Sequence, residues 1–289
     1  MCRALDLVSV ERLLDLTRAC QTARLPGDRL KFCIGQHHVG YVDPALAEAL
    51  IPDFTLTKGT VCLPHEAAAH LNAIVAPRAK QFGIHWRSEN FDVRARVGGD
   101  VLAVLDRGAI PAFGIIGVGV HLNGIVRRSN GPFIWVAKRS STKQLDPGKY
   151  DSLVGGGVPS GFSPRGALIK EAAEEASIGA DLIANAREVS RVDYAMQRPE
   201  GLRRDHLVCY DLELAEDFVP RPNDGEVDGF ELWPAAEVLE TMLANNAFKF
   251  NVNLVLIDWL IREKLLPQNA RERLRAALLL QTAEPISCP

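Results

Sequence analysis

Residues 155 to 178 read GGGVPSGFSPRGALIKEAAEEASI, a glycine-rich turn followed by a short helix. Glu171 lies three and four positions before Glu174 and Glu175, so the three carboxylates share one face of that helix. Like charges this close repel one another and destabilise the helix unless a cation lies among them. Mg²⁺ is a hard cation that prefers several oxygen ligands. The stretch therefore predicts a carboxylate face that binds a divalent metal.

The ends of this helix are predicted from its capping residues. Ser163 suits the N-cap and Pro164 the first helical position, while Gly179 is expected to supply the left-handed residue that ends the helix. These positions define a helix of about fifteen residues. Its apolar residues lie roughly opposite the glutamates: Leu168, Ile169, Ala172, Ala173 and Ala176. One face is therefore expected to pack on a sheet while the other presents carboxylates.

Two interpretations of the acidic face remain open at this point. Solvated acidic faces are common on amphipathic helices, and such a face binds nothing. The glycines that precede the helix favour a binding site, because a backbone without side chains can approach a phosphate closely. These glycines are Gly155, Gly156 and Gly157.

Composition limits the class of protein. The chain has 289 residues, of which 47% are hydrophobic and 24% charged, typical of a soluble globular protein with room for two domains. A net charge of −3 does not favour electrostatic binding to nucleic acid or to an anionic membrane. Acidic residues interrupt the apolar N-terminal stretch, which argues against a secretory signal. The cysteines are scattered without metal or redox spacing and are expected to be reduced thiols: Cys2, Cys20, Cys33, Cys62, Cys209 and Cys288. We therefore expect a cytoplasmic protein.

The pattern along the chain predicts three parts. Residues 1–112 read as a small α/β domain, 113–265 as a second α/β domain that contains the glutamate helix, and 266–289 as a C-terminal helix and tail. Uncharged residues 108–126 contain five glycines, which suits buried strands better than a membrane helix. Helices are also expected over 65–83, with a break at Pro77, and over 241–265.

The glutamate stretch resembles the Nudix box, G-x5-E-x7-R-E-U-x-E-E-x-G-U, where U is aliphatic. The box glycine falls on Gly156, the R-E pair on Lys170 and Glu171, and the E-E pair on Glu174 and Glu175. The departures from the pattern are Phe162 at the early glutamate, Lys170 at the arginine, Ala172 at the aliphatic residue and Ser177 at the late glycine. Lysine supplies a point charge where arginine offers a bidentate fork. The absence of the early glutamate puts a peripheral ligand or contact in doubt, but not the central glutamates.

The resemblance extends beyond the box. FGIIGVGVHLNGIV, TKQLDPGKYDSLVGGG and DGEVDGFELWP are similar to Nudix proteins related to thiamin pyrophosphokinase. FCIGQHHVGYVDPALAEAL and HWRSENFDV are similar to the poorly characterised domain that precedes those Nudix domains. The match runs from about Lys31 to Trp259. It implies a Nudix α/β/α sandwich with a mixed sheet, preceded by a small α/β domain with a possible role in substrate specificity.

The resemblance also implies an activity. The resemblance to this subgroup implies hydrolysis of thiamin diphosphate, or of its oxo and oxy analogues, to the monophosphate and phosphate. By that resemblance Glu171, Glu174 and Glu175 hold Mg²⁺, with Mn²⁺ as an alternative, and Glu171 is the candidate general base. Glu226 is the candidate for an additional acid, and Asp224 is its rival.

The remaining candidates would bind the substrate. Arg139 and Lys143 precede the glycine run and are candidates for phosphate contacts, and Lys170 for orienting the carboxylates. An aromatic wall would suit a thiamin-like ring, and its candidates are Trp86, Trp135 and Tyr194. His121 belongs to one of the stretches that resemble the subgroup and is a further candidate.

Other functions compete with this prediction. One is a general nucleotide or nucleotide-sugar diphosphate hydrolase, and another is a non-catalytic Nudix module that binds a ligand. An isoprenoid-diphosphate isomerase is disfavoured because no cysteine is suitably placed. The expected partner is a small-molecule diphosphate, with no nucleic acid and no membrane, and a homodimer is compatible with the sequence.

Overall fold

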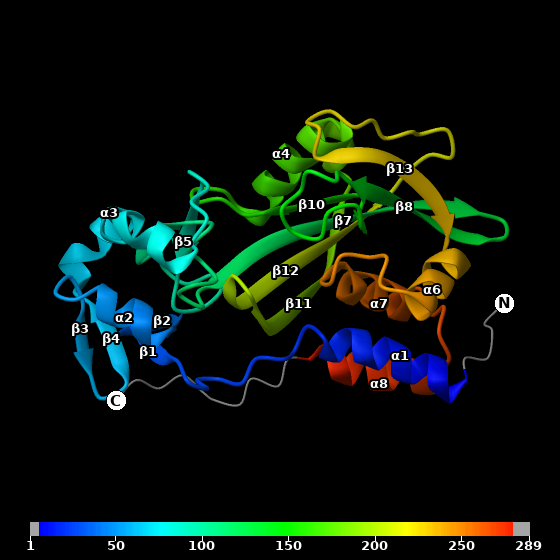
Figure 1. Ribbon diagram of the computed structural model, residues 1–289. Coiled ribbons are helices and arrows are strands. Elements are labelled where there is room, and N and C mark those ends of the chain that lie inside the picture. The colour runs from blue at the N-terminus through cyan, green and yellow to red at the C-terminus, as the bar shows by residue number, and fades with distance from the viewer. Residues whose placement is uncertain (1–5, 280–289) are drawn as a thin grey trace.

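A computed structural model describes residues 6–279, and the predictions for Cys2, Cys288 and the tail lie outside this range. A mixed sheet in the order β11-β12-β7-β8-β13 forms the centre, with β10 paired to β7 and β9 paired to β8 (Figure 1). Only the β7–β12 pair is parallel among these pairings. The strands are β7 (Ile116–Arg128), β8 (Gly131–Arg139), β9 (Tyr150–Ser152), β10 (Val154–Gly157), β11 (Arg187–Arg198), β12 (Gly201–Glu213) and β13 (Val227–Pro234).

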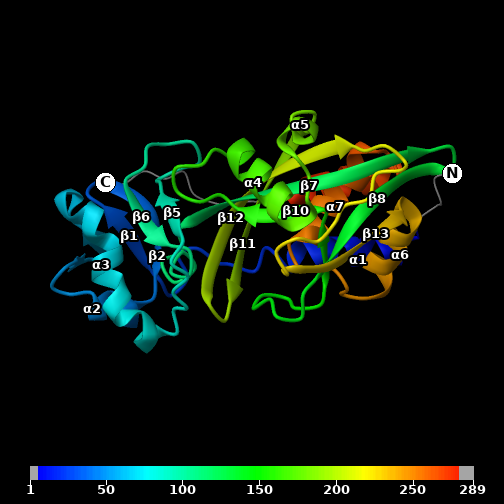
Figure 2. The same cartoon turned by 90° about the horizontal axis from the view of Figure 1, so that it is seen from above.

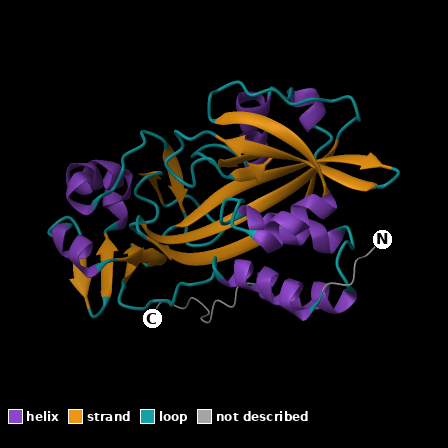
Figure 3. Ribbon diagram, turned by 45° about the vertical axis from the view of Figure 1, so that its right-hand side comes forward, coloured by secondary structure: helices purple, strands orange, loops and turns teal. Residues whose placement is uncertain are grey.

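Helices cover both faces of this sheet (Figure 3). α4 (Pro164–Ala176) and α5 (Ala180–Ile183) pack on one face with Leu122, Val154 and Val208. α6 (Ala235–Ala244) and α7 (Val252–Arg262) pack on the other face. The predicted α/β/α sandwich with a mixed sheet is confirmed.

The first helix packs away from the unit that follows it in sequence. Val10, Leu13 and Leu14 of α1 (Leu7–Arg18) are buried in one cluster with α7 and α8 (Gln268–Leu278). Figure 1 shows α1 alongside α8, below the sheet. The range 1–112 therefore includes a helix whose apolar face packs on α7 and α8, not on the N-terminal unit.

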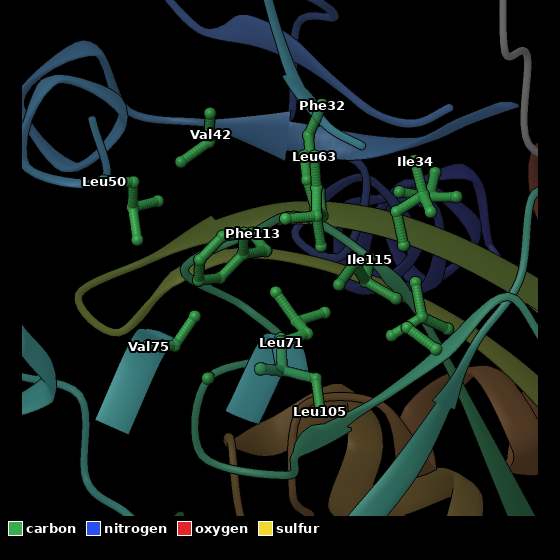
Figure 4. Close-up of a cluster of buried hydrophobic side chains, with 14 of the residues drawn as sticks. Phe32, Ile34, Val42, Leu50, Leu63, Leu71, Val75, Leu105, Phe113 and Ile115 are labelled. Atoms are coloured by element: carbon green, nitrogen blue, oxygen red, sulfur yellow. The ribbon is translucent and has the colours of Figure 1, made fainter. Parts of the chain in front are cut away.

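The N-terminal unit has a core of its own. Its sheet has the order β2-β1-β4-β3, and a separate hairpin joins β5 to β6. Phe32, Leu63, Leu71, Leu105 and Phe113 meet in the core, as Figure 4 shows. The elements are β1 (Leu30–Ile34), β2 (His37–Val42), α2 (Pro44–Ala49), β3 (Thr55–Thr57), β4 (Thr60–Leu63), α3 (Leu71–Val75), β5 (Asn90–Val93), β6 (Ala103–Asp106) and the 3₁₀ helices η1 (His65–His70) and η2 (Ala76–Phe82). Figure 2 shows this unit at one end of the molecule, beside the tip of the β11–β12 hairpin.

Two predicted helices are divided in the structure. The segment 65–83 forms η1, α3 and η2 in succession, so the change near Pro77 is a tightening to 3₁₀ geometry. The segment 241–265 is interrupted after Ala244, because residues 247–249 bond to β9. Tyr150 N donates to Ala247 O at 2.8 Å and Lys249 N donates to Tyr150 O at 2.9 Å. These bonds satisfy backbone groups that a continuous helix would otherwise pair internally.

The glutamate helix begins as predicted and ends earlier. Ser163 Oγ accepts from Gly166 N at 3.0 Å and Pro164 occupies the first turn. The left-handed residue is Ser177, with φ of 54°, whereas Gly179 is extended. Ser177 Oγ donates to Arg221 O at 3.0 Å, a tertiary contact that holds a serine where glycine was expected.

Candidate active site

A cavity of about 530 Å³ lies where the N-terminal unit meets the central sheet. The sheet contributes the glycine strand β10 and the start of β7, and α4 contributes two of its glutamates. The N-terminal unit contributes His85, Arg87, Phe91 and Arg107 to the same wall. The cavity is therefore shared by both parts of the chain.

The glutamates of α4 differ in their surroundings. The side chains of Glu171 and Glu175 are 15% and 7% exposed and line the cavity, whereas Glu174 is 48% exposed and does not. Lys170, four residues before Glu174, pairs with that carboxylate and lies 3.6 Å from Glu171. The helix therefore turns two carboxylates inward and one outward.

The glycine strand packs directly against these two carboxylates. Gly155 N donates to Glu175 Oε2 at 3.0 Å. A Cβ added at Gly156 would lie 2.4 Å from Glu171 Cδ, and one added at Gly157 would lie 2.3 Å from Phe91 Cζ. A side chain at either position would displace Glu171 or Phe91, so glycine lets β10 pack closely against both.

Burial changes the acidity of the inward carboxylates. It raises the pKa of Glu175 to about 7, although the Gly155 N–H and Lys143 act in the opposite direction. Burial also raises the pKa of Glu171, against the lowering effect of Lys170. Glu175 is thus able to exchange a proton near neutral pH.

Lys143 lies between two acidic groups of the cavity. Its ammonium is 3.8 Å from Glu175 Oε1 and forms an ion pair with Glu226, the residue before β13. Glu226 lines the cavity, and its rival Asp224 does not. Asp224 instead accepts from the backbone N–H of Glu226 at 2.8 Å, which fixes the turn.

A buried network supports the floor of the cavity. Asp151 pairs with Arg139 at 2.7 Å and with Lys249 at 3.3 Å. Burial alone would raise the pKa of Asp151, but Lys249, His121 and Arg139 outweigh it and hold that pKa at about 2. His121 Nδ1 lies 3.0 Å from Ser152 Oγ, and burial lowers the pKa of His121 to about 4. His121 is therefore neutral at physiological pH.

Comparison with known proteins identifies the family. A family model described as NUDIX domain matches residues 119–254. Nudix hydrolase 24, chloroplastic, of Arabidopsis thaliana is 37% identical over 254 residues, covering 83% of this chain and 69% of that protein. The chain belongs to the Nudix hydrolase family. Nudix hydrolase 20, chloroplastic, of the same plant is 44% identical over 176 residues, covering 61% of this chain.

The matches to whole proteins are partial. This Nudix chain spans about half of the length of Nudix hydrolase 20 (47%) and about two thirds of Nudix hydrolase 24. A crystal structure of DR0079 from Deinococcus radiodurans is 24% identical, with a TM-score of 0.45 over 58% of this chain and 97% of that one.

Among residues 6–279, no helix is both long enough and apolar enough to cross a membrane.

Nudix hydrolases generally use divalent metals such as Mg²⁺. Within the described residues, no three histidine, cysteine or acidic side chains are gathered around one metal position. Of the three predicted glutamates, Glu174 lies outside the cavity and pairs with Lys170. Glu171 and Glu175 remain, and Mg²⁺ in proteins is often held by one or two carboxylates together with substrate phosphates. The donor set fits a magnesium ion in this way.

The predicted substrate contacts are only partly present in the wall. Arg139 lines it, but its guanidinium is bonded to Asp151 and to the carbonyls of Leu145 and Asp146. Trp86 packs against the N-terminal core, while its neighbours in sequence, His85 and Arg87, line the cavity.

The other two predicted aromatic walls are also elsewhere. Trp135 is buried beneath α4, and the Tyr194 hydroxyl donates to Asp205. Phe91 is the only phenylalanine, tyrosine or tryptophan of the wall within residues 6–279. Sequence reasoning chose Trp86 in HWRSENFDV and missed Arg87 and Phe91, which the same stretch contains.

Proposed function

We propose that this protein is a Mg²⁺-dependent hydrolase that cleaves a diphosphate bond in a small molecule. The placement of Glu171 and Glu175 supports the proposal most strongly. Glu175 is buried and Glu171 largely buried, and both pack against a backbone of three glycines in one cavity wall. A non-catalytic binding module has little use for two inward-facing carboxylates that repel the phosphates of a ligand.

Glu171 and Glu175 would hold the ion, which when bound polarises phosphoryl oxygens and lowers the pKa of water. Glu171 remains the candidate general base, and the raised pKa of Glu175 makes it an alternative. The backbone of β10 lets a phosphate approach closely. Lys143 supplies a positive charge next to Glu175.

For the substrate we propose thiamin diphosphate or one of its oxo and oxy analogues, cleaved to the monophosphate and phosphate. The support is the resemblance of the glycine loop, β7 and β13 to the subgroup related to thiamin pyrophosphokinase. Phe91 is the aromatic residue of the cavity wall that would contact such a ring. A nucleotide or nucleotide-sugar diphosphate is the second candidate, since the 530 Å³ cavity is within the range of ordinary ligand sites. A cytoplasmic location and a homodimer also remain predictions.

A substrate panel tests the proposal. Thiamin, oxothiamin, oxythiamin, nucleoside and sugar diphosphates are incubated with the full-length protein, with and without Mg²⁺, and phosphate release is measured. We expect Mg²⁺-dependent release from the thiamin group, which Glu171→Gln and Glu175→Gln should each lower strongly. Release that persists in the double variant Glu171→Gln/Glu175→Gln would exclude this site as the source.

A further inference from the structure

The N-terminal unit places two arginines in the active-site wall. Arg87 follows η2 and Arg107 follows β6, and both line the cavity that contains Glu171 and Glu175. Both side chains are exposed to that cavity and to solvent. Neither belongs to the Nudix box.

A buried carboxylate fixes the chain segments that carry these arginines. Asp106 is fully buried, and its Oδ1 accepts from Arg87 N at 2.9 Å and from Gly108 N at 2.8 Å. The two segments touch, because a Cβ at Gly108 would lie 1.8 Å from His85 O. Burial of a carboxylate is costly unless hydrogen bonds compensate it, so Asp106 is part of a specific local structure. These hydrogen bonds fix the backbone at Arg87 and next to Arg107 relative to each other.

The charges of the wall distinguish Arg87 from its neighbours. Every other lysine and arginine of the wall has a carboxylate within ion-pair distance: Arg107, Arg139, Lys143, Arg198, Arg203 and Lys249. Within residues 6–279, Arg87 has no such partner. Arg107 pairs with Glu89 at 2.8 Å and lies over the ring of Phe91 at 5.6 Å.

These arginines lie within electrostatic reach of each other and of the glutamate helix. Burial is the main cause that lowers the pKa of Arg87, and the charge of Arg107 lowers it further, against the raising effects of Asp106 and Glu89. Arg107 in turn acts to lower the pKa of Glu171, although burial outweighs it. Arg87, which has no ion-pair partner among the described residues, therefore lies in the same cavity wall as the carboxylates that would otherwise repel a diphosphate.

We propose that Arg87 and Arg107 bind the phosphate groups of the substrate, so that the N-terminal unit forms part of the active site. This inference rests on the proposed function and assigns the anion-binding side of the same cavity. The guanidinium group suits the role because its planar fork donates two parallel hydrogen bonds to a phosphate. Arg87 is free to do so, and Arg107 can exchange its half-exposed partner Glu89 for a more highly charged ligand.

Binding of a non-hydrolysable diphosphate tests the proposal without turnover. Methylenediphosphonate is titrated calorimetrically into the full-length protein in excess Mg²⁺. Each charge-assisted hydrogen-bonding side chain is worth about 1.5–3 kcal/mol, so Arg87→Gln and Arg107→Gln should each weaken binding about tenfold or more. Arg87→Lys keeps the charge and should lose less. Arg96→Gln is the matched control, because Arg96 is an exposed arginine of the same unit that does not line this cavity.

The outcomes separate this inference from the proposed function. Unchanged affinity in both glutamine variants, with thermal unfolding that shows intact folding, overturns the inference. A wild type that does not bind the diphosphonate overturns it as well. Arginine-dependent binding without hydrolysis of any diphosphate in the panel supports the inference and contradicts the proposed function. When turnover is present, the glutamine variants should raise KM more than they lower kcat.

Discussion

The buried histidine of β7 predicts a measurable effect of pH on stability. His121 has its pKa lowered from 6.5 to about 4, with burial as the main cause, so the folded state resists protonation. The unfolded chain binds a proton below pH 6.5 and the folded chain does not until about pH 4. Stability is therefore lost as pH falls through this window. By linkage the cost is about 0.2 kcal/mol at pH 7, about 2 kcal/mol at pH 5 and about 3 kcal/mol below pH 4.

Urea denaturation of the wild type and of His121→Asn at pH 7, 6 and 5, without metal, measures this cost. The variant loses the contact with Ser152 Oγ, so it is expected to be the less stable protein at pH 7. Its disadvantage should shrink by about 2 kcal/mol between pH 7 and pH 5, because only the wild type is destabilised by protonation at this position. His37→Asn, at an exposed position of β2, is the control and should follow the wild type. A stability difference between wild type and His121→Asn that is independent of pH would refute this reasoning.

Three further predictions concern the site. Glu171→Gln and Glu175→Gln should each lower the steady-state rate of hydrolysis about 100-fold or more. Glu174→Gln should lower it less, because the Glu174 side chain is exposed. Equal losses in all three variants would mean that Glu174 turns inward during turnover. Gly156→Ala should cost about 1–3 kcal/mol in thermal unfolding because its Cβ meets a carboxylate at 2.4 Å, and an unchanged midpoint would contradict this packing. Asp151→Asn should cost about 3–5 kcal/mol in urea, because it leaves buried cations unpaired, and a cost below about 1 kcal/mol would argue against the network.

Local patterns in the sequence predicted those parts of the fold that depend on near neighbours. Ser163 and Pro164 marked the start of α4, and the uncharged run 108–126 favoured buried strand, which the structure shows as β7. The errors lie where distant segments compete for backbone hydrogen bonds. Tyr150 interrupts the predicted helix over 241–265 by pairing with residues about a hundred positions away, and Arg221 holds Ser177 as the end of α4.

The residues of the site that belong to a sequence motif were also predictable. Glu171, Glu175 and Glu226 line one cavity with Lys143 and His121, as the motif and the subgroup resemblance suggested, although their roles stay predictions. The wall from the N-terminal unit was not predictable residue by residue. Its position depends on how two separately packed cores meet, and no helical or strand periodicity records that contact.

Lysine side chains supply positive charge to the glutamates of the site. Repulsion among neighbouring glutamates requires positive charge, and α4 meets part of that requirement with its own Lys170, which binds Glu174. Lys143 does the same from a loop, pairing with Glu226 and approaching Glu175 at 3.8 Å. A metal that binds Glu175 therefore competes with an ammonium group already near it. We expect the affinity for Mn²⁺, measured by calorimetry, to rise in Lys143→Met, since the competitor is removed while the carboxylates remain; a lower affinity would show that Lys143 supports the metal-bound arrangement instead.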